Sequence, residues 1–201
     1  MKEATLKQAG KVLEVIGETP CEQLQKILSS GLLSDLLSAN VDLVDRDVVR
    51  QALGLKPIGM HSYLMTIDYD RSVKDGIKAG NYDWRNDDIT AKNFPSQETG
   101  TAEVSIDILH FGKDISTDEV RAELDKHGYR PATLKELLAL GEKHSNLQRE
   151  FPIIALGSVW QGPHGYRRCP YLYRDGSERC LGLGWVDSWW RGSCRFAAVR
   201  K

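Results

Sequence analysis

The sequence predicts an α+β protein, with an N-terminal helical unit over 1–57 and a second domain over 58–201. Apolar residues recur at helical spacing in the first part of the chain, and apolar and polar residues alternate in several later segments. In the second part, helices precede a run of short strands, an order typical of α+β domains with a mainly antiparallel sheet. At 201 residues the chain is long enough for two small domains.

Residues 1 to about 55 are expected to form four short helices. The first covers 6–16, and the motif Thr19-Pro20-Cys21-Glu22 predicts the start of the second, as a capping box with Pro at the first helical position. A third helix is expected over 32–37 and a fourth over 45–53, before a linker at 56–59. The residues that the second helix should turn inward are Leu24, Ile27 and Leu28.

After residue 60 the periodicity changes from helical to alternating. The segments 63–69 and 103–111 both alternate apolar with polar residues, which predicts two strands. Between them, 70–100 is rich in Asp, Asn, Gly and Lys, so it is expected to be loop with one short helix near 73–79.

Two capped helices and a set of strands follow. Ser116-Thr117-Asp118-Glu119 and Thr133-Leu134-Lys135-Glu136 each have the form of a capping box, and Gly128 is the expected stop of the first helix. Asp175-Gly176 marks a hairpin turn. A strand before the two helices and a strand at the end of the chain favour pairing of first and last strands, which brings the ends of the domain together. The later strands are expected at 151–160, 166–173, 179–185 and 194–200.

Composition and charge narrow the function classes. The net charge of −1 gives no global bias toward nucleic acid. From Trp160 onward, however, eight Lys and Arg stand against three Asp and Glu, so this part carries +5 and the rest −6. A basic lobe favours an acidic partner, and an ordinary solvated face explains the same counts equally well.

The N-terminus lacks an apolar signal-peptide core and no run has membrane-spanning length, so we expect a cytoplasmic protein with no membrane partner. The cysteines Cys21, Cys169, Cys180 and Cys194 form no CxxC pair and have no His at metal-ligand spacing, so no metal or other cofactor is expected. Free thiols are favoured, and a Cys180–Cys194 disulfide is expected only in an exported protein.

The C-terminal tail, about 179–201, is the most informative segment. Apolar positions alternate with Gly, a non-repeating run of Trp, Ser, Gly, Arg and Cys follows, and an apolar strand closes the chain. Rigid aromatic residues with small adaptable neighbours are typical of a binding surface. The tail shows no arrangement of nucleophile, acid and base, so we expect no catalytic residues and no enzyme activity.

Two segments resemble the C-type lectin fold in the compact form that formylglycine-generating-enzyme-like domains share. Gly128–Glu136 is similar to the G-x-R-L-P-T-x-x-E stretch before the second helix, although Pro131-Ala132-Thr133 stands where Leu-Pro-Thr is usual. Arg195–Arg200 is similar to the terminal strand of that superfamily. The resemblance implies a lectin-like domain over 58–201.

A closer likeness is to the variable proteins of diversity-generating retroelements. In these proteins the end of a lectin-like domain is diversified by adenine-directed mutagenesis. Val186, Trp189 and Ala197 depart from the usual residues of such a tail. The segments that resemble its fixed scaffold are Pro152–Trp160, Cys169–Tyr173, Trp185–Asp187 and Arg195–Arg200.

The resemblance implies that the positions between the fixed segments vary and bind a ligand, a protein or another macromolecule of unknown identity. Mutated adenines in Asn codons can yield Gly, Ser, Cys and Arg but not Trp. Trp189 therefore needs a different template codon, and it is included because an outward Trp would make a good anchor. The implied ligand-binding residues are Cys180, Gly182, Gly184, Ser188, Trp189, Arg191, Gly192, Ser193 and Cys194.

Several tail residues also fit a purely structural role. Trp185 and Trp190 are expected to fill the core below the binding face. Gly182 and Gly184 fit either close packing or the floor of a shallow pocket. The alternative functions are a fixed-specificity lectin-like module and an enzyme of the formylglycine-generating type. A calcium-dependent lectin is disfavoured because its Glu-Pro-Asn, Gln-Pro-Asp and Trp-Asn-Asp signatures are absent. The acidic N-terminal helices argue against DNA binding, and the oligomeric state stays open.

Overall fold

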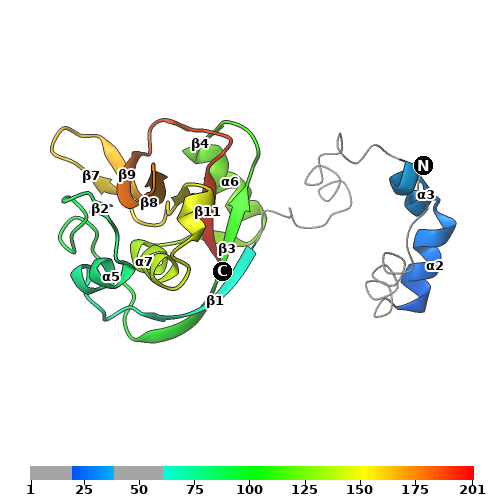
Figure 1. Cartoon of the computed structure of the whole chain (residues 1–201), viewed down its shortest axis with the longest axis horizontal. Helices are drawn as coiled ribbons and strands as arrows, with labels where there is room; N and C mark the ends of the chain where they lie inside the picture. Colours follow the sequence, from blue (N-terminus) through cyan, green and yellow to red (C-terminus); the bar gives the residue numbers. More distant parts are fainter. Residues whose placement is uncertain (1–19, 39–60) are drawn as a thin grey trace. The chain divides into compact units, whose positions relative to one another are not determined.

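A computed structural model describes residues 20–38 and 61–201 (Figure 1). The chain divides into two compact units, 1–49 and 50–201. The helices expected at 6–16 and 45–53, the linker at 56–59 and the domain boundary after residue 57 lie outside the described residues.

In the N-terminal unit, helix α2 spans Cys21–Ser29 and helix α3 spans Leu32–Ser38. Pro20 is the N-cap of α2 and Cys21 its first residue, so the expected Pro at the first helical position is wrong. Thr19, the capping residue of the expected box, lies outside the described residues. Gly31, at φ +74°, ends α2, because glycine adopts this left-handed conformation without strain. Contrary to expectation, Ile27 and Leu28 are exposed and Leu24 is only half-buried, since α2 buries no residue against its surroundings.

The C-terminal unit is a mixed α+β structure built on a nine-stranded sheet in the order β1-β3-β11-β6-β8-β9-β2, with β5 beside β11 and β7 beside β8. A two-stranded sheet joins β10 to β4. The strands are β1 His61–Asp68, β2 Trp84–Arg85, β3 Thr101–His110, β4 Ile115–Ser116, β5 Tyr129–Pro131, β6 Ile153–Ile154, β7 Trp160–Gln161, β8 Arg167–Asp175, β9 Glu178–Trp185, β10 Trp189–Trp190 and β11 Arg195–Arg200. The helices are α5 Val73–Gly80, α6 Thr117–Lys126, α7 Leu134–Lys143 and α8 Leu147–Glu150.

The expected mainly antiparallel sheet is confirmed: only the β11–β6 and β2–β9 pairs are parallel. The strand before the two helices, β3, pairs with the last strand, β11, while β1 lies at the sheet edge beyond β3. The single strand expected over 151–160 is instead two short ones. At Gly157 the chain bends against the backbone of 131–132, where a side chain would come within 2.6 Å of carbonyl oxygens.

Two apolar cores lie on opposite faces of the sheet, because successive side chains of a strand point to opposite faces. Ile108 of β3 and Ala197 of β11 belong to the core that α5 and α7 cover. Their neighbours Leu109 and Phe196 belong to the second core, with α6. The sheet therefore holds helices on both faces, and Figure 1 shows α6 on one side of the unit and α5 beside α7 on the other.

The local signals near the helices are largely confirmed. Ser116 Oγ accepts from the N–H of Glu119, whose carboxylate accepts from the N–H of Ser116 at 2.9 Å, so α6 has its full capping box. At α7 Thr133 is the expected N-cap, and the carboxylate of Glu136 accepts from the N–H of Thr133 at 2.7 Å.

The hairpin turn falls where it was expected, between β8 and β9, with Gly176 at φ +56°. No helix within residues 20–38 and 61–201 is long and apolar enough to cross a membrane.

Candidate functional site

The tail forms β9, a turn, β10, a loop and β11, and between β9 and β11 exposed residues stand between anchored ones. Val186 and Trp190 are buried, whereas Ser188, Arg191 and Ser193 are exposed. Because β10 pairs with β4, the turn is also held to the start of α6. The segment 186–194 is therefore presented from a fixed backbone.

The hydroxyl of Thr117 ties the two ends of the turn together. Trp190 Nε1 donates to Thr117 Oγ1 at 2.9 Å, and the same hydroxyl donates to the carbonyl of Val186 at 2.7 Å. Thr117 is itself buried, as the first residue of α6. The Trp190 ring packs edge-on against Phe196, with 6.1 Å between ring centroids. Trp190 thus fills the core below the tail, as expected.

Gly192 fixes the loop between β10 and β11 to the end of β3 and the residues that follow it. Its N–H donates to Asp114 Oδ1 at 2.8 Å, and its carbonyl accepts from His110 Nε2 at 2.7 Å. A Cβ at this position would lie 3.1 Å from the backbone of Lys113. Gly192 is therefore an anchor of the loop, although the sequence placed it among the ligand-binding residues.

Trp189 is the largest exposed side chain of the tail. It is 65% exposed, while its neighbour Trp190 is 8% exposed, because successive residues of β10 point to opposite faces. The outward orientation expected for Trp189 is confirmed. Beside it, the exposed Ser188, Arg191 and Ser193 offer hydroxyl and guanidinium groups.

Three of the implied ligand-binding residues lie on one face of β9 below aromatic rings. Tyr171 and Tyr173 stack with 4.7 Å between ring centroids, and a Cβ at Gly182 would lie 2.8 and 2.9 Å from them. At Gly184 a Cβ would lie 2.7 Å from the Trp190 ring. These glycines serve close packing, which corrects the pocket-floor alternative. Cys180, 2% exposed, is buried like Gly182, so neither presents a side-chain surface to a ligand.

Trp185 corrects a second expectation, because it is 46% exposed and does not fill the core. It shares a face of β9 with Leu181, which is buried, and Leu183, which is half-buried, so burial falls as the strand leaves the core. The exposed Tyr166 meets the Trp185 ring edge-on at 5.0 Å, and the guanidinium of Arg168 lies 4.4 Å from its centroid. Sequence reasoning missed this exposed aromatic pair.

The three cysteine thiols of the C-terminal unit are poor nucleophiles. All four cysteines are free. Burial raises the pKa of Cys169, Cys180 and Cys194 above that of an ordinary thiol, so the reactive thiolate is scarce at neutral pH. Within the described ranges, no group of three or more His, Cys, Asp or Glu residues is placed to hold a metal ion.

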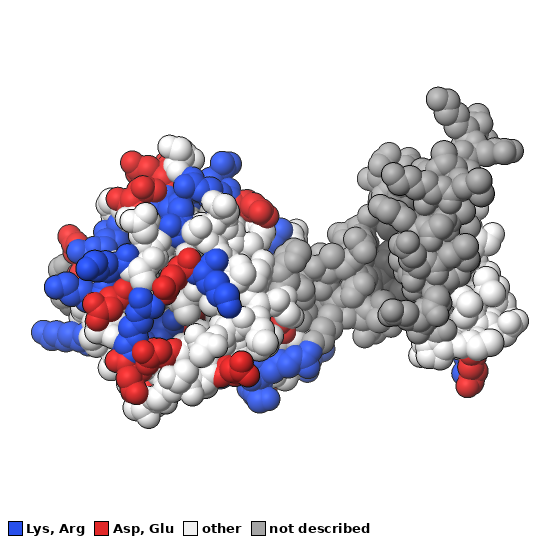
Figure 2. All heavy atoms as spheres, turned by 60° about the horizontal axis from the view of Figure 1, so that its bottom comes forward, with Lys and Arg blue, Asp and Glu red and all other residues white. Residues whose placement is uncertain are grey.

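The charges of the C-terminal unit do not gather into a single patch on the face drawn in Figure 2, where both signs are interspersed. Part of the basic surplus is locally neutralised. Arg167 Nε donates to Asp187 Oδ1 at 2.9 Å, and these hydrogen bonds hold the pKa of Asp187 below its ordinary value. The Arg191 side chain has no such partner among the residues the structure describes.

Comparison with protein-family models, with curated proteins and with solved structures finds no match to this chain.

Proposed function

We propose that this chain is a non-catalytic ligand-binding protein whose C-terminal unit is lectin-like and whose tail, diversified by a retroelement, carries the binding surface. The observation that carries the proposal is that exposed residues stand between the anchored residues Val186, Trp190 and Gly192 in the segment 186–194. Exposed positions on such a frame can change without loss of the core. Binding sites tend to lie on loops that a rigid scaffold positions.

The composition of the exposed set supports binding. Trp and Arg are enriched among the residues that dominate interface energies, and Trp189 and Arg191 are both exposed. A Trp supplies a large contact area with only two side-chain torsions to order. We place the ligand contacts on Ser188, Trp189, Arg191 and Ser193, with the exposed Trp185 beside them in the chain.

The residue types support diversification. Ser188, Arg191 and Ser193 are residues that mutated Asn codons can yield, whereas Trp190, which such codons cannot yield, is one of the buried anchors. A repeat of the tail-coding sequence near the gene, differing only at adenines and lying beside a reverse-transcriptase gene, is the expected finding.

Sequencing the locus and its flanks from the source population tests this. Variation concentrated in the codons of the exposed residues is expected. An invariant tail with no repeat nearby would contradict diversification and leave a lectin-like module of fixed specificity. An enzyme of the formylglycine-generating type would instead act on a cysteine-containing peptide and lose that activity in Cys169→Ser or Cys180→Ser.

A further inference from the structure

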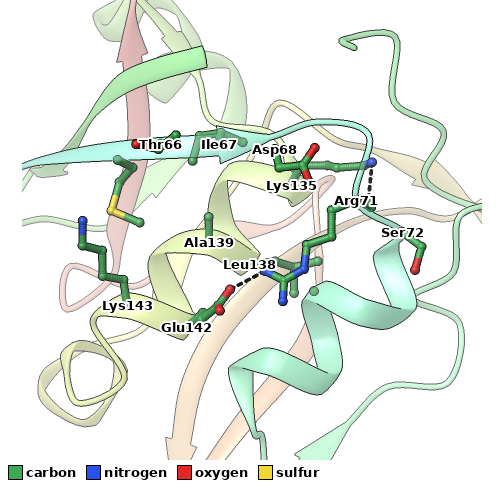
Figure 3. A pocket seen from close by; sticks show the side chains of 12 residues that line it. Thr66, Ile67, Asp68, Arg71, Ser72, Lys135, Leu138, Ala139, Glu142 and Lys143 are labelled. Atoms are coloured by element: carbon green, nitrogen blue, oxygen red, sulfur yellow. Dashed lines mark hydrogen bonds and ion pairs between the residues drawn. The ribbon is translucent and has the colours of Figure 1, made fainter. Parts of the chain in front are cut away.

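A second site lies away from the tail, in a pocket of about 360 Å³ bounded by β1, the turn that follows it, α5 and α7 (Figure 3). All of its lining residues fall between Met65 and Lys143, so the tail contributes none. The volume lies within the range of small-molecule sites. The pocket plays no part in the proposed tail function.

The floor of the pocket is apolar. Met65, Ile67 and Leu138 are buried side chains of β1 and α7, and Ala139 adds only a methyl group. Gly76 lets α5 approach α7 closely, since a Cβ there would lie 3.1 Å from Leu138 Cδ1. A short aliphatic chain could displace water from this floor, which is favourable in proportion to the apolar area it covers.

Lys135 supplies a positive charge with no carboxylate within ion-pair distance among the described residues. Its ammonium donates to the carbonyls of Tyr69 and Arg71 at 2.5 and 2.6 Å. An ammonium has three N–H donors, so one remains. The side chain is partly buried, where a charge is screened less than in open water. The geometry favours an anion at this end of the pocket.

The two carboxylates that line the pocket are already engaged. Glu142 pairs with Arg71 at 2.5 Å, and Figure 3 shows the two joined beside Leu138. Asp68 Oδ1 accepts from the N–H of Asp70 at 3.0 Å, as part of the turn after β1. Lys143 lies at the end of the pocket opposite Lys135. The charged lining residues are Arg71, Lys135 and Lys143 against Asp68 and Glu142, so the lining as a whole carries a surplus of one positive charge.

We propose that this pocket binds a small carboxylate with a short aliphatic body. The carboxylate accepts the remaining N–H of Lys135, and the aliphatic body lies on Ile67, Leu138 and Ala139. Neutral and cationic molecules of the same shape lack the charge interaction and bind more weakly.

Hexanoate is the probe, titrated into the ¹⁵N-labelled full chain, with 1-hexanol and hexylammonium as matched controls. Hexanoate should shift the amide signals of 65–72 and 135–143 and leave those of 186–194 in place. Its affinity should exceed that of both controls by about tenfold. Equal binding of the three molecules, or the absence of shifts with hexanoate, would overturn the proposal.

Two variants test separately how the charge of Lys135 and the apolar floor of the pocket contribute to hexanoate binding. Lys135→Met should weaken hexanoate binding by about tenfold and leave hexanol binding unchanged. Lys126→Met on α6 is the matched control and should bind as the parent chain does. Since Lys135 also holds the turn at 69–71, Ala139→Phe provides a second test that keeps this contact. It should abolish binding of both probes, and unchanged hexanoate binding in a folded Ala139→Phe variant would contradict the site.

Discussion

The two halves of the tail were both expected to bind the ligand, but they lie in opposite surroundings. Over 180–184, Cys and Gly lie below tyrosine and tryptophan rings, whereas over 188–193, Ser, Trp and Arg face outward between buried anchors. The difference comes from the neighbouring strand. Residues of β9 have β8 beside them along their whole length, while the segment after β9 has strand partners only at its short pairing with β4.

The arginines of the two halves make the contrast clearest. Arg179 is buried, and its guanidinium donates to the carbonyls of Gly80, Gly141 and Ser145 at 2.7 to 2.8 Å. Arg191 is exposed, and its side chain makes no hydrogen bond or ion pair among the described residues. The first arginine holds helices and sheet together, and the second is free to meet a ligand.

The adjacent tryptophans of β10 should give the largest difference. Trp190→Ala leaves a cavity below the tail and removes the hydrogen bond to Thr117, so it should lower the free energy of unfolding by about 3–5 kcal/mol. Trp189→Ala should change it by less than about 0.5 kcal/mol. Urea denaturation of the two variants measures both values. Similar losses would show that the two rings do not differ in role.

The arginine pair should give the next effect. Arg179→Met leaves four backbone carbonyls, those of Gly80, Asn81, Gly141 and Ser145, without this donor. Each unsatisfied buried group costs about 1–3 kcal/mol, so a loss of at least about 3 kcal/mol is expected. Arg191→Met should be neutral within about 0.5 kcal/mol. Thermal and urea unfolding provide the comparison, and a stable Arg179→Met variant would argue against its central position.

The hydroxyl of Thr117 can be removed with little change of shape. Thr117→Val leaves Trp190 Nε1 and the carbonyl of Val186 unpaired and should cost about 1–3 kcal/mol. Thr117→Ser keeps the hydroxyl and should retain the larger part of this stability. If the two substitutions cost the same, the packing of the methyl group, and not the hydrogen bonds, holds the turn.

Gly182 should show the smallest effect of the four. Gly182→Ala forces the stacked rings of Tyr171 and Tyr173 to shift, at a cost of about 1–2 kcal/mol, with a change in the near-ultraviolet circular dichroism of these rings. Ser188→Ala on the exposed half is the control and should leave both stability and spectrum unchanged. An unaltered spectrum in Gly182→Ala would mean that the rings do not cover this position.

Local signals predicted much of the fold. The strand at 63–69, the capped start of α6 and the hairpin at Asp175-Gly176 each depend on residues close together in the sequence, and all three are confirmed. The two-residue strand β2 carries no such signal, because its pairing with β9 joins residues almost a hundred positions apart. The bend at Gly157 could not be predicted from neighbouring residues either, because the backbone that Gly157 approaches, at 131–132, belongs to another segment of the chain.

In the tail, too, the sequence predicted the surroundings of some residues and not of others. Period-two alternation indicates that Trp189 and Trp190 face opposite sides, but it cannot say where a strand leaves the core, which is why Trp185 was assigned to the interior. The burial of Cys180 and Gly182 depends on Tyr173 and Tyr171 across the hairpin. Composition alone gave no means of separating these positions from the exposed Ser188 and Ser193.

A pair of libraries tests the central claim most directly. One randomises the exposed positions Ser188, Trp189, Arg191 and Ser193, and the other randomises the anchors Val186, Trp190 and Gly192 together with Gly184. The fraction of protease-resistant members is measured in each displayed library. We expect most of the first library to fold and few members of the second to do so. Equal resistance in both would contradict the division of the tail into an anchored frame and a replaceable binding surface.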